Sequence, residues 1–262
     1  MTQPPGTDDG IPLGTVLEGD CLDVMRVWPA GCVDLVYLDP PFNTGRRHRG
    51  ADSDFDDRFQ DLHAYLDFID QRLQAVHRLL KTTGSVMLHC DWRTCHHLRC
   101  RLDAIFGADA FVNHLIWHYG LGGSSPRRFA RKHDDILFYA RGPDYYFEPP
   151  RVAATSNRMR GQTKKATDVL AIPAINNMAR ERTGYPTQKP VALLRLLIEA
   201  AAPPGGVVLD PFCGSGTTLV AARATGRRCV GVDLNTDAVA LSRRRMVGTD
   251  GRALPAGDLV QT

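Results

Sequence analysis

Apolar and polar positions follow two distinct patterns along the chain, and each pattern predicts one kind of element. Apolar residues spaced three or four apart predict a helix over residues 62–80, with Leu66, Ile69 and Leu73 on its buried face. Short apolar runs bounded by glycine, proline or charged residues predict strands. These runs are Val33–Leu38, Ser85–His89, Val112–Trp117, Ile136–Tyr139, Val207–Leu209 and Cys229–Val232.

Helical spacing also covers Arg93–Ile105, Val191–Ala201 and Thr217–Ala224. Strands that alternate with helices are typical of an α/β fold, with a mostly parallel sheet and helices on both faces. Residues 142–186 interrupt the alternation with prolines, adjacent aromatic residues and little periodicity. We therefore expect an insertion or long functional loop there, outside the sheet. The last residues, 247–262, have the composition of a loose tail.

Composition limits the class of protein. The chain has 262 residues, of which 43% are hydrophobic and 23% charged, and these values suit one globular α/β domain. No apolar run approaches the roughly 20 residues that span a bilayer, and the polar N-terminal sequence lacks the features of a signal peptide. These observations favour a cytoplasmic protein.

The seven cysteines are an odd number and are scattered, which is typical of reduced thiols. Cys90, Cys95 and Cys100 recur at intervals of five positions in "HCDWRTCHHLRC". The closest pairings of zinc ligands are tighter than this interval, so buried or surface thiols are favoured and no metal is expected.

Chemistry-bearing residues follow the first predicted strand in the sequence "YLDPPFNTG". Proline cannot donate to a strand ladder, so Pro40 and Pro41 mark the point where the chain leaves the sheet. Ligands of open α/β sheets collect at the carboxyl ends of the strands. Asp39 and Phe42 are therefore expected beside a crevice, whereas an ordinary turn with a solvated acid is the alternative for Asp-Pro alone.

A second site is predicted in "VVLDPFCGSGTTLVAARATGRRCVGVDL", where two strands flank a glycine-rich turn and a helix. Gly214 and Gly216 let the backbone approach a ligand, and Asp233 stands where such units place an acid on ribose hydroxyls. A dinucleotide fingerprint would need glycine at Leu219, and a P-loop would need lysine in the turn. Asp210 instead offers a carboxylate to a positively charged ligand. S-adenosylmethionine has that charge, an ammonium group and an adenosine.

Four motifs in a fixed order make the interpretation specific. They are "GDCLDVM" (19–25), "LDPPFNTG" (38–45), "YPTQKP" (185–190) and "LDPFCGSGTT" (209–218). Over residues 13–245 the chain resembles the beta-class DNA amino-methyltransferases, which methylate adenine N6 or cytosine N4, and it is similar to type II and type III restriction-modification methyltransferases. The resemblance implies a Rossmann-like, S-adenosylmethionine-dependent methyltransferase fold with circularly permuted motif order.

In that order the catalytic half precedes the target-recognition region, and the cofactor loop comes last. The resemblance thus implies a catalytic half in residues 1–141, a small target-recognition insertion in 142–186, and a cofactor-binding half of the same domain in 187–246. Residues 247–262 form the tail.

The resemblance also implies roles for individual residues. The catalytic tetrapeptide is Asp39, Pro40, Pro41 and Phe42, with phenylalanine in place of the more usual tyrosine. The Asp39 carboxylate and the Pro40 carbonyl would accept the amino hydrogens of a flipped base that stacks on Phe42. The cofactor-binding residues are Asp20, Cys21, Asp39, Thr187, Gln188, Lys189, Asp210, Pro211, Phe212, Cys213, Gly214, Ser215, Gly216, Thr217, Thr218, Asp233, Leu234 and Asn235.

Basic residues gather in three short islands although the net charge is only +3. Each island alone would more often be a solvated face, but beside this site we expect contacts to DNA phosphates. The expected contacts are Arg46, Arg47, Arg49, Arg127, Arg128, Arg131, Lys132, Lys164 and Lys165.

Aspartate at position 39 is typical of the family's adenine enzymes, so the resemblance implies methyl transfer from S-adenosylmethionine to adenine N6 in double-stranded DNA. Cytosine N4 is the alternative, and an RNA methyltransferase is a more remote one. A non-catalytic cofactor-binding or DNA-binding module is disfavoured, because Asp39 and the cofactor loop are both intact. A homodimer and a cognate restriction endonuclease are further partners that the resemblance leaves open.

Overall fold

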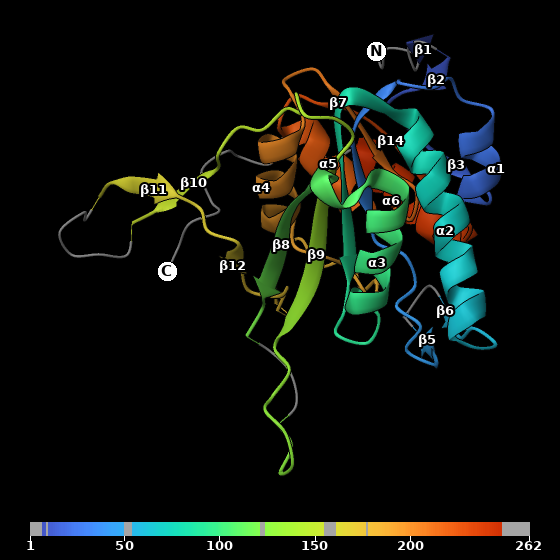
Figure 1. Cartoon of the computed structure of the whole chain (residues 1–262). Helices are drawn as coiled ribbons and strands as arrows, with labels where there is room; N and C mark the ends of the chain where they lie inside the picture. Colours follow the sequence, from blue (N-terminus) through green and yellow to red (C-terminus); the bar gives the residue numbers. More distant parts are fainter. Residues whose placement is uncertain are drawn as a thin grey trace.

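The computed structural model describes residues 7–8, 10–49, 54–120, 124–154, 161–176 and 178–247. Its centre is an eight-stranded sheet in the order β12-β8-β9-β7-β4-β13-β14-β3 (Figure 1). Within the described residues, β9 runs antiparallel to both neighbours and every other pairing in this sheet is parallel. The strands are β3 (Thr15–Glu18), β4 (Val33–Leu38), β7 (Leu80–Cys90), β8 (Phe111–His118), β9 (His133–Ala140), β12 (Val169–Ala171), β13 (Val207–Asp210) and β14 (Arg228–Asp233).

Helices cover both faces of the sheet. One face carries α1 (Cys21–Arg26), α2 (Leu62–Leu79) and α3 (Cys95–Phe106), and their apolar side chains share a core with the strands. The other face carries α4 (Val191–Ala201), α5 (Thr217–Ala224) and α6 (Thr236–Val247) around a second core. The predicted α/β architecture is confirmed. None of the helices in the described part of the chain has the length and apolar character of a membrane span.

Smaller elements surround this body. They are the pairs β1 (Thr7–Asp8) with β2 (Ile11–Pro12), β5 (Arg46–Arg49) with β6 (Asp54–Asp57), and β10 (Arg151–Ala153) with β11 (Thr163–Lys165), together with the short helix η1 (Ala108–Ala110). The β10–β11 hairpin projects away from the sheet (Figure 1).

The expectation that residues 142–186 stay outside the sheet is wrong for β12. This short strand pairs in parallel with β8 and forms the sheet edge, with Val169 opposite Ile116. Leu170 is buried, and the Trp117 indole donates a 2.8 Å hydrogen bond to the carbonyl of Ile172 just beyond the strand. Three residues are too few to give a readable alternation. The division into two halves and an insertion stays a prediction, and the tail beyond Val247 lies outside the described residues.

The topology gathers several loops at one edge of the sheet. Strands β4, β7, β8, β13 and β14 all point the same way, so their carboxyl ends share that edge. The described residues of the connection between β8 and β9, 119–120 and 124–132, lie at the same edge and extend far beyond it, and we call them the arm (Figure 1). Ligands of such sheets are expected at this edge.

Candidate active site

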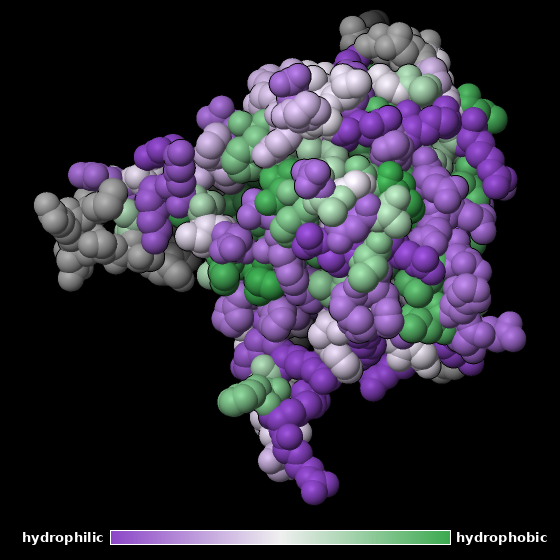
Figure 2. All heavy atoms as spheres, viewed as in Figure 1, coloured by the Kyte–Doolittle hydropathy of each residue, from purple (hydrophilic) through white to green (hydrophobic). Residues whose placement is uncertain are grey.

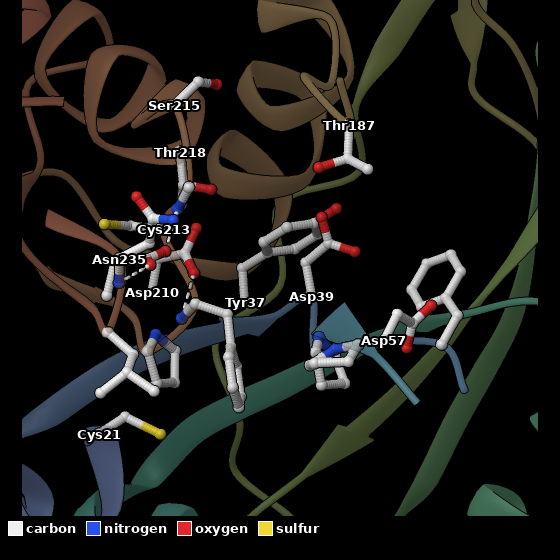
Figure 3. Close-up of a pocket in the computed structure, with 18 of the residues that line it drawn as sticks. Cys21, Tyr37, Asp39, Asp57, Thr187, Asp210, Cys213, Ser215, Thr218 and Asn235 are labelled. Atoms are coloured by element: carbon white, nitrogen blue, oxygen red, sulfur yellow. Dashed lines mark hydrogen bonds between the residues drawn. The ribbon is translucent and has the colours of Figure 1, made fainter. Parts of the chain in front are cut away.

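A cavity of about 630 Å³ lies at the carboxyl ends of β4, β13 and β14. Figure 3 shows its two sides, with Asp210 and Asn235 on one and Asp39 and Asp57 on the other. Most residues that the sequence motifs predicted line it together. They are Asp20, Cys21, Asp39, Pro40, Pro41, Phe42, Thr187, Lys189, Asp210, Pro211, Phe212, Cys213, Gly214, Ser215, Thr217, Thr218, Asp233, Leu234 and Asn235.

Two predicted cofactor-binding residues do not line the cavity. The amide of Gln188 is used within its own segment, where it accepts from the Thr183 backbone at 2.8 Å and donates to the Glu181 carbonyl at 2.6 Å. Gly216 caps α5 with φ +77, and an added Cβ would lie 2.7 Å from the Ser242 hydroxyl. Both residues therefore shape the loops beside the cavity, and their contact with a cofactor stays a prediction.

Two carboxylates, one buried and one half-buried, end adjacent strands on one side of the cavity. Asp210 is only 2% exposed, and burial raises its pKa to about 7 although the Phe212 N–H donates to it at 3.0 Å. Asp233 accepts from the backbone N–H groups of Gly214 at 2.7 Å and Asn235 at 2.9 Å, and burial raises its pKa as well. Desolvated carboxylates of this kind favour a positively charged ligand or hydrogen-bond donors.

The glycine-rich turn brings the backbone to the cavity wall. Gly214 has φ +47, and an added Cβ would lie 3.1 Å from the Tyr185 ring. A side chain there would both strain the turn and fill space between the turn and Tyr185. The Tyr185 ring therefore packs directly against the turn, and the glycine permits this close contact.

The far end of the cavity holds an ion pair that the motifs did not reveal. Asp20 caps α1 by accepting from the Leu22 N–H, and both of its carboxylate oxygens lie 2.8 Å from Nη2 of Arg72 on α2. The guanidinium lies 3.5 Å from the centre of the Phe68 ring, which also lines the cavity. The sequence signal was a charged residue on the apolar face of α2, between Ile69 and Val76.

The carboxylate of Asp39 is paired at the exit of β4. Nζ of Lys189 lies 2.5 Å from Oδ2 of Asp39, and both side chains are largely buried. The positive charge therefore compensates Asp39 where solvent reaches it poorly. Lys189 also lies 5.4 Å from the Phe42 ring centre, so it stands between the acid and the aromatic face.

A buried histidine supports this corner from behind. His89 is fully buried, and its ring contacts Tyr37 (2.6 Å from the hydroxyl to Nδ1) and Asp134 (3.3 Å from Nε2 to Oδ2). Because a carboxylate only accepts, Nε2 carries the proton and the Tyr37 hydroxyl donates to Nδ1. Burial alone would raise the pKa of Asp134, but the His89 hydrogen bond and the charge of Lys189 help hold it below its ordinary value. Nδ1 lies 4.0 Å from Asp39.

The loop after the tetrapeptide is fixed by Asp57. This buried carboxylate accepts from the backbone N–H groups of Asn43 at 2.8 Å and Thr44 at 3.1 Å, and from the Thr44 hydroxyl at 2.7 Å. Asn43 adopts a left-handed backbone with φ +54, which asparagine tolerates better than most residues. The turn is thereby held, and Phe42 lies half-buried 5.6 Å from the His89 ring.

A family model described as DNA methylase matches residues 33–244, which is most of the chain. The chain belongs to this family. The type II methyltransferase M.ScaI of Streptomyces caespitosus is 29% identical over 241 residues, covering 84% of this chain and 77% of the relative. The DNA adenine methyltransferase YhdJ of Escherichia coli (strain K12) is 27% identical over 249 residues, covering 88% and 82%.

Solved structures agree in fold with this DNA methylase. The cytosine-N4-specific PvuII DNA methyltransferase gives a TM-score of 0.69 at 17% identity and covers 91% of this chain and 88% of its own. The M1.HpyAVI–SAM complex gives 0.64 at 18% identity and covers 88% and 98%. The resemblance inferred from the motifs is confirmed, and S-adenosylmethionine is the cofactor of the family.

The basic residues that were predicted to contact DNA do not line the cavity, as far as the structure describes them. Arg46 is exposed on β5, whereas the side chains of Arg47 and Arg49 lie outside the described part of the structure. On the arm, Arg131 lies 3.3 Å from the Trp92 ring centre and Lys132 donates to the Gly120 carbonyl at 2.9 Å. The arm residues Arg127 and Arg128, and Lys164 and Lys165 on β11, are exposed.

The arm and the β10–β11 hairpin, the two segments that project from the body of the protein, present a predominantly hydrophilic surface in their described residues (Figure 2). Several residues that line the cavity were not among the predicted site residues; some lie within the quoted motifs and the others come from other parts of the chain. They are Gly19, Tyr37, Thr44, Asp57, Arg58, Phe59, Phe68, Arg72, Tyr185 and Leu194.

Proposed function

We propose that this DNA methylase transfers the methyl group of S-adenosylmethionine to the exocyclic N6 of an adenine flipped out of duplex DNA. The observation that carries the proposal is the position of Asp39. Its carboxylate lines the same cavity as the Asp210 and Asp233 carboxylates, at the end of the neighbouring strand. One side of the cavity suits a cofactor and the other a target amine.

The residues present fit the cofactor. Asp233 is placed to accept from ribose hydroxyls, and Asp210 offers negative charge to the amino-acid end. Gly214 and Ser215 line the cavity beside these acids, so an extended ligand would lie along the backbone of the glycine-rich turn. When bound, S-adenosylmethionine supplies an electrophilic methyl group, and the residues of this chain orient the acceptor toward it.

Asp39 then acts on the target. An exocyclic amine is a poor nucleophile because its lone pair is delocalised into the ring. Hydrogen bonds from the amine to Asp39 and to the Pro40 carbonyl would draw the nitrogen toward a tetrahedral state. Lys189 is paired with Oδ2 of Asp39, so we assign to it the role of orienting the carboxylate before the base enters. Phe42 provides the stacking face.

DNA would approach the edge from which the arm extends. Arg127 and Arg128 are exposed there, and Phe129 between them and Arg131 is 96% exposed. Exposed arginines are suited to contact DNA phosphates. A solvent-exposed aromatic ring between them is suited to insert beside an unstacked base. Arg131 is stacked on Trp92, which fixes the base of the arm to the body of the protein. We therefore propose that the arm, with Arg46 on the other side of the catalytic loop, holds the duplex.

Cytosine N4 is the second candidate target, and it is favoured by the structural likeness to a cytosine-N4-specific enzyme. The test is to methylate duplex DNA with labelled S-adenosylmethionine, digest it to nucleosides and separate them by mass spectrometry. N6-methyladenine is expected, N4-methylcytosine alone would overturn the adenine assignment, and transfer to RNA in preference to DNA would overturn the substrate. A homodimer, a cognate endonuclease and a cytoplasmic location remain predictions from the sequence.

A further inference from the structure

A cluster of metal-binding side chains lies away from the cavity, on the face of the sheet that α3 covers. Cys95 is the first residue of α3, His114 lies on β8 and Asp135 on β9. Their ligand atoms all lie within 4.8 Å of one another. Three elements that are separate in sequence thus bring a thiol, an imidazole and a carboxylate to one point, and none of these residues lines the active-site cavity.

The contacts show that the three groups converge. Nε2 of His114 lies 3.7 Å from Sγ of Cys95 and 2.7 Å from Oδ1 of Asp135. A catalytic relay would use the two opposite ring nitrogens, one toward the acid and one toward the nucleophile. Here a single nitrogen faces both partners. This arrangement is that of ligands around a common centre.

The spacing fits a tetrahedral ion of the zinc class. Zinc bonds of about 2.3 Å to sulfur and about 2.05 Å to nitrogen place those two ligand atoms about 3.6 Å apart. The observed separation of Cys95 and His114 is 3.7 Å. The closer His114–Asp135 pair must open by about 0.6 Å to admit the ion, again from zinc bond lengths. The half-exposed imidazole can make that adjustment, because it is the most solvent-accessible of the three side chains.

A second, buried thiol stands beside the cluster. Cys90 is fully buried and pairs with Asp135 in the β7–β9 ladder. Four residues separate Cys90 from Cys95, so this interval is at the upper limit of the Cys-x2–4-Cys range and is not too wide for zinc ligands, contrary to the expectation from the sequence. A helix N-terminus favours a negatively charged ligand at Cys95. Two anionic ligands would match the charge of a divalent ion.

We propose that Cys95, His114 and Asp135 bind a thiophilic divalent metal ion such as Zn²⁺. The ion joins the start of α3 to β8 and β9, the two strands that carry the arm. It also fixes β9 next to Asp134. The Asp134 carboxylate contacts the His89 ring, and that ring lies 4.0 Å from Asp39. Its role is to rigidify this corner of the sheet, and the proposal is independent of which base is methylated.

The test measures metal content and affinity. Protein purified without chelator is expected to hold about one zinc per chain by plasma mass spectrometry. Cobalt titration of the stripped protein is expected to give thiolate-to-metal charge-transfer absorption. The variants Cys95→Ser and His114→Gln are each expected to weaken metal binding by at least about tenfold. The matched controls Cys100→Ser and His96→Gln, whose exposed side chains lie on the same helix, are expected to bind as the wild type does.

Folding is checked separately from binding. His114→Gln alters a half-exposed side chain, so circular dichroism is expected to show a wild-type fold. Chelation is expected to lower the melting temperature of the wild type and to leave that of His114→Gln unchanged. Absence of both zinc and cobalt binding, or wild-type affinity in a folded His114→Gln protein, would overturn the proposal.

Discussion

Asp210→Asn is expected to stabilise the ligand-free protein while weakening cofactor binding. Burial raises the pKa of Asp210 from its ordinary 3.8 to about 7. Between those two values the native state holds a proton that the unfolded chain has lost, so the free energy of unfolding falls as pH rises through this range. The shift of about three units corresponds to about 4 kcal/mol of lost stability above pH 7, at about 1.36 kcal/mol per unit.

Asparagine cannot ionise and avoids this loss. Its amide oxygen can still accept from the Phe212 N–H, which donates to Asp210 at 3.0 Å. The NH₂ group of asparagine takes the place of a carboxylate oxygen that can accept hydrogen bonds. A buried donor that is left without a partner costs about 1–3 kcal/mol. We therefore expect a net gain of about 1–3 kcal/mol at pH 8. Below about pH 4 Asp210 is protonated in both states, so only the cost of the buried amide remains and no gain is expected.

Urea unfolding of both proteins without ligand, followed by circular dichroism at pH 8 and pH 5, measures this difference. Calorimetry measures the accompanying loss of affinity for S-adenosylmethionine. In the wild type at pH 6.5, binding is expected to release a proton from Asp210, and this proton is detected by comparing buffers with different ionisation enthalpies. An Asp210→Asn protein that is no more stable than the wild type at pH 8, or a stability difference that is equal at both pH values, would refute the reasoning.

Three further predictions concern cofactor and DNA. Asp233→Ala is expected to weaken S-adenosylmethionine binding by about 1–3 kcal/mol by calorimetry, and unchanged affinity would mean that the ribose lies elsewhere. Replacing Arg127 and Arg128 by alanine is expected to lower the slope of log affinity against log salt by up to about two, whereas the lysine pair keeps it; a wild-type slope in the alanine pair would remove the arm from the interface. Phe129→Ala is expected to slow transfer to duplex DNA more than to DNA with a mismatched target, and equal slowing on both substrates would exclude insertion.

The sequence predicted those elements whose burial is strong and uniform. Val33–Leu38, Val191–Ala201 and Thr217–Ala224 have the predicted limits, because uninterrupted apolar patterns end there at proline, glycine or charged residues. Two elements of the described chain that the apolar pattern missed are short or weakly amphipathic. Strand β3 has one buried position among four, and helix α6 is rich in arginine, so neither has a clear pattern.

The candidate site was predictable where its residues share a motif. The tetrapeptide and the glycine-rich turn are continuous in sequence, and their geometry follows from proline and glycine chemistry. Contacts across the fold left no such signal. Lys189 reaches Asp39 over 150 positions, and His89 meets Asp134 only because β7 and β9 pair. The convergence of His114 with Cys95 also depends on tertiary pairing.

Single-turnover methyl transfer by Asp39→Ala tests the central claim most directly, because it separates action on the target amine from binding of the cofactor. The variant is loaded with labelled S-adenosylmethionine, mixed with duplex DNA and quenched over time, and its cofactor affinity is measured in parallel. The account predicts a rate about 10²–10³-fold below wild type with cofactor affinity changed by less than about threefold. A folded Asp39→Ala protein that transfers methyl groups at near the wild-type rate would contradict it.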